Sequence, residues 1–253
     1  MTNQANVATL PGMERLKGLG REVVDLLFPP HCVACNRFGG WLCANCLQEI
    51  DIIQAPTCRR CGLPLTGIVR TEGRLPVCPQ CCNLTSKLDG VCTFAFHGGP
   101  LREAIHQFKY ENLRALAAPL GRLLSEGWVT LSPNDLDVDV IVPVPLHASR
   151  LRERGYNQAA LLARELGHHL EHPVVEDVLV RVKDTIPQVG LDAQARRDNV
   201  HNAFQCLNGS LAGKRVLLLD DVYTTGSTLE AAADALRAEG VSSIWAYTLA
   251  RAR

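Results

Sequence analysis

Two neighbouring acids followed by a hydroxyl-rich loop are the residues of this sequence best suited to chemistry. Asp220 and Asp221 follow the apolar run 216–219, and their loop leads into an Ala-rich stretch. Free backbone amides and the positive end of a helix dipole meet in such a loop, which favours phosphate. The candidate phosphate ligands are Thr224, Thr225, Gly226, Ser227 and Thr228. The acids suit vicinal hydroxyls or a magnesium ion. An ordinary helix cap would explain the loop but leave two adjacent carboxylates unexplained.

A cluster of arginines follows a second apolar run, residues 138–142. After prolines that end the run come Arg150, Arg152 and Arg154, opposed locally only by Glu153. Guanidinium groups bind phosphates in a bidentate manner, so this segment favours a polyanion. Taken alone, it also fits a solvated basic loop or the start of a helix.

Ten of the eleven cysteines lie before residue 93, and eight of them form four CxxC pairs. Where disulfides do not form, so dense a cluster indicates metal binding. A shell of four cysteines leaves no open position, so we predict two structural zinc ions and not catalytic ones. Sequential pairing of the CxxC motifs is favoured over a cross-braced arrangement in which the first and third pairs share an ion. The predicted ligands are Cys32, Cys35, Cys43 and Cys46 for one ion, and Cys58, Cys61, Cys78 and Cys81 for the other.

The elements that position these residues alternate between strand and helix patterns. Short β-branched runs over 91–96, 138–142, 216–219 and 244–249 are separated by amphipathic stretches over 101–127, 156–170 and 228–238. This pattern predicts an α/β fold with a mostly parallel sheet flanked by helices, which binds ligands at the carboxyl ends of its strands. We expect an amphipathic helix over 11–28, a double zinc-ribbon module over 29–88 and the α/β domain over 89–253. Segment 181–204 is expected to be a mobile cover or a plain surface loop.

Composition excludes several classes of protein. Lys+Arg and Asp+Glu both number 26, which argues against wholesale electrostatic binding of nucleic acid. The stretch 209–214 has the wrong spacing for a Walker A loop and precedes a strand, which disfavours ATPase chemistry. No apolar run is long enough to span a membrane. The first residues do not resemble a signal peptide, so a cytoplasmic location is expected.

Two motifs carry a resemblance to known families. Segment 216–228 resembles the phosphoribosyl pyrophosphate signature of type I phosphoribosyltransferases, which implies their fold. Segment 140–158, which contains Pro-Val-Pro-Leu-His and Arg-Gly-Tyr-Asn-Gln, resembles the ComF/GntX family of competence-associated phosphoribosyltransferase-like proteins. The order of helix, double zinc module and transferase-like domain is also similar to that family, as is the tripeptide 108–110.

The resemblance implies that Asp220 and Asp221 hold the ribose hydroxyls and that the loop 224–228 holds the 5′-phosphate. Phosphoribosyl pyrophosphate would bind together with Mg²⁺. Arg150 and Arg154 are then the candidates for stabilising the leaving pyrophosphate, with His147 as a helper, and Asp221 is the acid expected to act as a base or to orient the magnesium shell.

The resemblance also implies a role in DNA uptake and natural transformation. The expected function is therefore phosphoribosyl transfer to an acceptor for which the sequence has no signature. The alternative is a non-catalytic accessory protein that binds single-stranded DNA, works with other proteins of the competence machinery and retains the phosphate site. A pure interaction scaffold is a third alternative.

Overall fold

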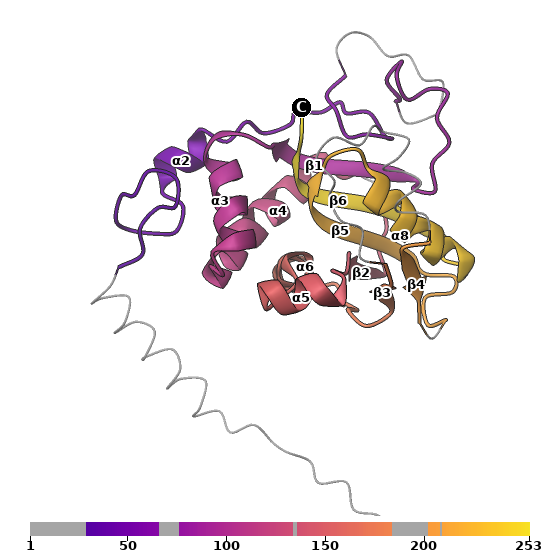
Figure 1. The fold of residues 1–253 in the computed structure, drawn as a ribbon. Coiled ribbons are helices and arrows are strands. Elements are labelled where there is room, and N and C mark those ends of the chain that lie inside the picture. The colour runs from indigo at the N-terminus through magenta and orange to yellow at the C-terminus, as the bar shows by residue number, and fades with distance from the viewer. Residues whose placement is uncertain (1–28, 66–75, 134–135, 184–201, 208) are drawn as a thin grey trace, which may run out of the picture.

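A four-stranded parallel sheet with helices on both faces forms the centre of the molecule (Figure 1). The computed structural model describes residues 29–65, 76–133, 136–183, 202–207 and 209–253, so the helix expected over 11–28 lies outside the described residues. The strand order is β1-β6-β5-β2, and all three neighbouring pairs are parallel. These strands are β1 (Gly90–Phe96), β2 (Val140–Pro143), β5 (Arg215–Tyr223) and β6 (Ser243–Arg251). The α/β class with a parallel sheet is confirmed.

The helices divide between the two faces of the sheet. One apolar core joins the sheet to α3 (Gly99–Tyr110), α4 (Ala117–Leu131) and α6 (Gln158–Leu170). The other core joins it to α8 (Ser227–Ala238), whose leucines and alanines pack on Val216 and Leu218. The amphipathic stretch predicted over 101–127 forms two helices, because Asn112 takes a left-handed φ of 54° and a short 3₁₀ turn, η1 (Arg114–Leu116), follows it.

Two short strands lie outside the main sheet. β3 (Leu179–Arg181) pairs in antiparallel fashion with β4 (Phe204–Cys206), and β4 packs along α8. Most of the cover predicted over 181–204 lies outside the described residues. Within the part of the chain that is described, no helix combines the length and the apolar character needed to cross a bilayer.

The cysteine-rich segment forms backbone hydrogen bonds with the outer edge of β1. The Ile53 amide donates to Phe94 O over 2.9 Å, the Phe96 amide to Asp51 O over 2.8 Å and the Val91 amide to Arg59 O over 2.7 Å. The segment also includes the short helix α2 (Ala44–Gln48) and adds apolar side chains to the core beneath α3 and α4, namely Leu42 and Ile50. It therefore closes an edge of the sheet that would otherwise offer unpaired backbone groups.

Candidate functional site

The topology brings the acid pair and the arginine segment to one edge of the sheet. β2 and β5 are adjacent and parallel, with Val142 opposite Leu218 and Pro143 opposite Leu219. The arginines follow β2 on a short helix, α5 (Ala148–Arg154). The hydroxyl-rich loop follows β5 and leads into α8. Because carboxyl ends of adjacent parallel strands open in one direction, the two loops face the same crevice.

The two acids lie inside β5 and not beyond its end, so successive side chains leave the strand in opposite directions. Asp221 is 7% exposed and pairs with Lys109 at the end of α3, with 2.7 Å between Oδ1 and Nζ. Asp220 Oδ1 accepts a hydrogen bond of 2.8 Å from the Asp221 amide. Burial and the charge of Asp221 raise the pKa of Asp220 to about 7, although Lys109 opposes that rise. At neutral pH the pair therefore carries less than two full negative charges.

The loop 224–226 places a glycine, which has no side chain to act as a cap, at the N-cap position of α8. Gly226 is the N-cap residue, with a left-handed φ of 79°. A Cβ at this position would stand 2.4 Å from the Tyr223 hydroxyl, so only glycine fits both the conformation and the space. The hydroxyls of Thr225 and Ser227 share a hydrogen bond of 2.9 Å, and Thr224 is exposed. Gly226 itself has no side chain to cap the helix, and Thr225 Oγ1 accepts a long hydrogen bond of 3.4 Å from the Ser227 amide at the first position of α8.

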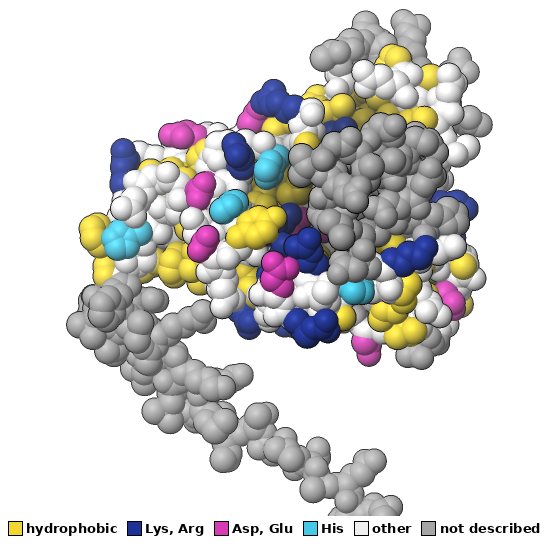
Figure 2. Space-filling view, viewed as in Figure 1, with side chains coloured by type: hydrophobic (Ala, Val, Ile, Leu, Met, Phe, Trp, Pro, Cys, Tyr) yellow, Lys and Arg dark blue, Asp and Glu magenta, His cyan; other side chains and the backbone are white. Residues whose placement is uncertain are grey.

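The arginines of α5 differ in how firmly they are held. Arg154 Nη1 donates to Gln158 Oε1 over 2.7 Å, and its guanidinium lies 5.3 Å from the ring centre of Tyr110. Arg150 pairs with the exposed Glu153 at 3.2 Å. Lys and Arg side chains gather on this face of the molecule around α5 (Figure 2). His147 caps the helix, since its Nδ1 accepts a hydrogen bond of 3.3 Å from the Ser149 amide, and its proposed role as a helper remains a prediction.

The cysteines form two clusters in sequential order and not a cross-braced set. Within each predicted set of four, all sulfur atoms lie within 4.8 Å of one another. The two clusters repeat one hydrogen bond: the Cys43 amide donates to Cys32 Sγ over 3.4 Å, and the Cys78 amide to Cys58 Sγ over 3.3 Å. Burial raises the pKa of Cys32, but amide hydrogen bonds outweigh it and lower the value to about 6. Four converging sulfurs with amide support fit a closed tetrahedral zinc site.

The three remaining cysteines lie outside both clusters, as expected. Cys82 is exposed, Cys206 is half-buried, and burial raises the pKa of the Cys92 thiol to about 12.

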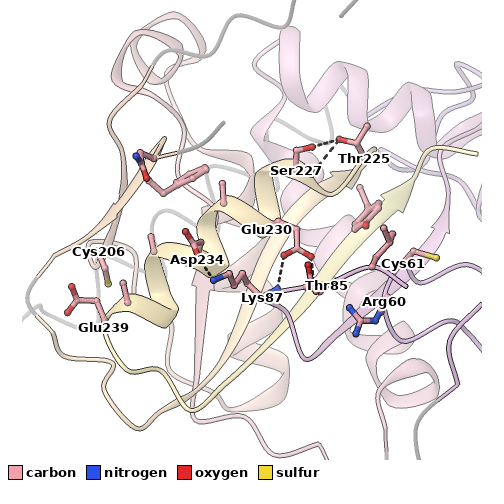
Figure 3. Close-up of a pocket in the computed structure, with 18 of the residues that line it drawn as sticks. Arg60, Cys61, Thr85, Lys87, Cys206, Thr225, Ser227, Glu230, Asp234 and Glu239 are labelled. Atoms are coloured by element: carbon pink, nitrogen blue, oxygen red, sulfur yellow. Dashed lines mark hydrogen bonds and ion pairs between the residues drawn. The ribbon is translucent and has the colours of Figure 1, made fainter. Parts of the chain in front are cut away.

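A pocket of about 830 Å³ lies beside the crevice, along the outer face of α8 (Figure 3). Arg60 and Cys61 lie at one end, Cys206 and Glu239 at the other, and Thr225 and Ser227 on its border. Neither acid of β5 and no arginine of α5 lines it. The pocket thus borders the loop 224–228 but does not include the charged residues of β5 and α5.

Three residues near the site were not among the predicted site residues, namely Lys109, Tyr223 and Arg251. Lys109 lies in the tripeptide 108–110, which resembles the ComF/GntX family, and this resemblance was the one indication in the sequence that Lys109 could matter. Tyr223 and Arg251 are ordinary strand residues in the sequence, and only the pairing of β5 with β6 places them opposite each other.

Fold and site together define a phosphoribosyltransferase-like protein with a double zinc ribbon. Residues 151–253 match the Phosphoribosyl transferase domain family, and residues 23–82 match the Double zinc ribbon domain family. The chain belongs to the ComF/GntX family of competence protein F. It is 34% identical to competence protein F of Haemophilus influenzae, over 83% of this chain and 90% of that protein.

Two further relatives agree with this assignment. The chain is 32% identical to DNA utilization protein YhgH of Escherichia coli K12, over 89% of this chain and 99% of that protein. It is 28% identical to competence protein ComFC of Bacillus subtilis, over 83% of this chain and 84% of that protein.

Proposed function

We propose that this protein binds phosphoribosyl pyrophosphate with Mg²⁺ in the crevice at the carboxyl ends of β2 and β5, and transfers the phosphoribosyl group to an acceptor. The observation that carries the proposal is the parallel pairing of these two strands. Because of this pairing the acid pair, the N-terminus of α8 and the arginines of α5 all follow the carboxyl ends of adjacent strands, which supports binding of a phosphorylated sugar there.

Each part of the crevice has a role in this reaction. The amides and hydroxyls of residues 224–228 bind the 5′-phosphate, and the carboxylates of Asp220 and Asp221 bind the ribose hydroxyls. Arg150 and Arg154 stabilise the charge of pyrophosphate as its bond to the anomeric carbon breaks and the acceptor bonds to that carbon. Carboxylate oxygens are suitable ligands for Mg²⁺, which when bound neutralises pyrophosphate charge, and Asp221 is the acid we assign to orienting its shell.

The names of the relatives suggest where this activity is used. Proteins called competence protein F and DNA utilization protein match most of this chain. We infer that the protein serves DNA uptake or the use of incoming DNA, in contact with other competence proteins. The second candidate is binding of single-stranded DNA without catalysis. Gel shifts at moderate salt separate the two, because DNA binding without any binding of phosphoribosyl pyrophosphate favours the accessory role.

Calorimetric titration of the full chain with phosphoribosyl pyrophosphate tests the proposal. We expect binding that requires Mg²⁺ and is lost in the double variant Asp220→Asn/Asp221→Asn. Asp234→Asn is the matched control, because Asp234 is an exposed acid on α8 that pairs with Lys87 outside the crevice. An intact protein that gives no heat with the ligand and Mg²⁺ would refute the proposal.

A further inference from the structure

One arginine and one tyrosine connect the second cysteine cluster to the loop 224–228. Arg251 lies at the end of β6, directly opposite Tyr223 at the end of β5, and is 9% exposed. Its Nη1 donates to the carbonyl of Cys61, and its guanidinium lies 4.5 Å from the centre of the Tyr223 ring. The hydroxyl of that tyrosine borders Gly226, the N-cap residue of α8. Cys61, Arg251, Tyr223 and Gly226 therefore form a continuous series of contacts.

We propose that Arg251 is a positioning residue through which the turn of the second cluster, Cys58–x–x–Cys61, holds the phosphate loop in its binding conformation. The identity of the ligand, phosphoribosyl pyrophosphate, rests on the proposed function, whereas the contacts of Arg251 with Cys61 and Tyr223 do not depend on it. It follows that metal at the second cluster supports ligand binding from outside the crevice.

The bonding of Arg251 supports a positioning role. Among the residues that the structure describes, no carboxylate pairs with this buried cation, and its Nε has no hydrogen-bond partner. Its guanidinium is instead held by a main-chain carbonyl and an aromatic face. The position of that carbonyl depends on the CxxC turn, because Gly62 N donates to Cys58 O over 2.7 Å across the same turn. A change in the turn would thus move the one main-chain acceptor described for Arg251.

A second series of contacts leads from this turn to β6, the strand that pairs with the one carrying the acids. Gly62 has a φ of 69°, and a Cβ there would stand 2.9 Å from Thr93 Oγ1. Thr93 Oγ1 lies 3.0 Å from Thr248 Oγ1, and Thr248 is the strand partner of Asp220. The turn of the second cluster is therefore linked to the loop through Arg251 and Tyr223, and to Asp220 through Thr93 and Thr248.

The first cluster offers an internal comparison. Its neighbours Leu42 and Ile50 pack in the core beneath α3 and α4, whereas the loop residue Tyr223 belongs to the core on the α8 face. We expect the two metals to differ in their effect on ligand binding, although their ligand sets are alike.

The experiment compares single variants of the zinc-loaded full chain by hydrogen exchange and by calorimetry. In Arg251→Gln, the amides of residues 223–228 should exchange faster and the affinity for phosphoribosyl pyrophosphate should fall about tenfold, which corresponds to losing one charge-assisted hydrogen bond. Tyr223→Phe removes the hydroxyl that borders Gly226 and keeps the ring, so it should show a weaker form of the same effect. Arg253→Gln is the matched control, since Arg253 is an exposed arginine of the same chain end that pairs with Asp51.

The two clusters are compared in the same assays. Cys81→Ala should release one zinc ion and increase exchange at residues 223–228, whereas Cys35→Ala should release one zinc ion and leave that exchange unchanged. Unchanged exchange of the loop in Arg251→Gln and in Cys81→Ala would overturn the proposal. Because hydrogen exchange needs no ligand, a protein that fails to bind phosphoribosyl pyrophosphate would refute the proposed function and still leave the coupling to be measured.

Discussion

Replacing Lys109 by methionine tests the idea that an ion pair fixes the charge of the crevice. The Lys109 and Asp221 side chains are only 21% and 11% exposed, and their charged atoms are 2.7 Å apart. Removing one partner of a buried pair leaves the other charge uncompensated and costs about 3–5 kcal/mol. Since Lys109 retains some contact with water, we expect about 3 kcal/mol, which for a chain of this length lowers the melting temperature by about 6–12 °C.

Thermal unfolding of four proteins measures this pair: the parent, Lys109→Met, Asp221→Asn and the double variant. The double variant should recover much of the stability, because no unpaired charge remains. Lys87→Met is the control, since its pair with Asp234 has side-chain exposures of 58% and 49% and should matter far less. Equal melting temperatures for Lys109→Met and the parent, or fully additive effects in the double variant, would refute the reasoning.

Three other predictions concern pH, the loop and the metals. The pKa of Asp220 is raised from 3.8 to about 7, so its contribution to the free energy of unfolding is full at low pH and is lost as pH rises to about 7. Mg²⁺-dependent ligand binding should strengthen over the same rise in pH. Asp220→Asn should flatten the pH profiles of stability and of binding, and wild-type profiles that are already flat would contradict the assignment of this pKa to Asp220. Gly226→Ala should weaken ligand binding at least tenfold, because the left-handed φ and the Tyr223 hydroxyl both oppose a Cβ; unaltered calorimetric affinity would show that the loop does not bind the ligand. Metal analysis should find about two zinc ions per chain, and chelation should unfold the cysteine-rich segment as seen by circular dichroism; a folded chain with no metal would contradict the zinc prediction.

The sequence was sufficient for the four strands of the main sheet and for the cysteine pairing, because both depend on local patterns, whereas the short strands β3 and β4 were not predicted. Apolar runs bounded by turn residues place β2, β5 and β6, and the CxxC spacing places pairs of sulfurs at one turn. The break at Asn112 was missed because residues 101–127 keep a helical apolar pattern on both sides of it. The partner of Asp221 was also missed, since Lys109 belongs to α3 and approaches the acids only after that helix packs on the sheet.

The crevice carries a cost in stability that its proposed ligands would offset. Burial and the neighbouring charge of Asp221 raise the pKa of Asp220, so a second negative charge is unfavourable at this place in the folded protein. Lys109 neutralises one acid of the pair, Arg150 pairs with Glu153, and Arg154 contacts Gln158 and Tyr110. A cation bound with a polyanion would satisfy the acids and the amides at the N-terminus of α8 at once. If the two acids served only the fold, neutral residues at these positions would make the protein more stable, and this is the reason that we propose a binding role for them.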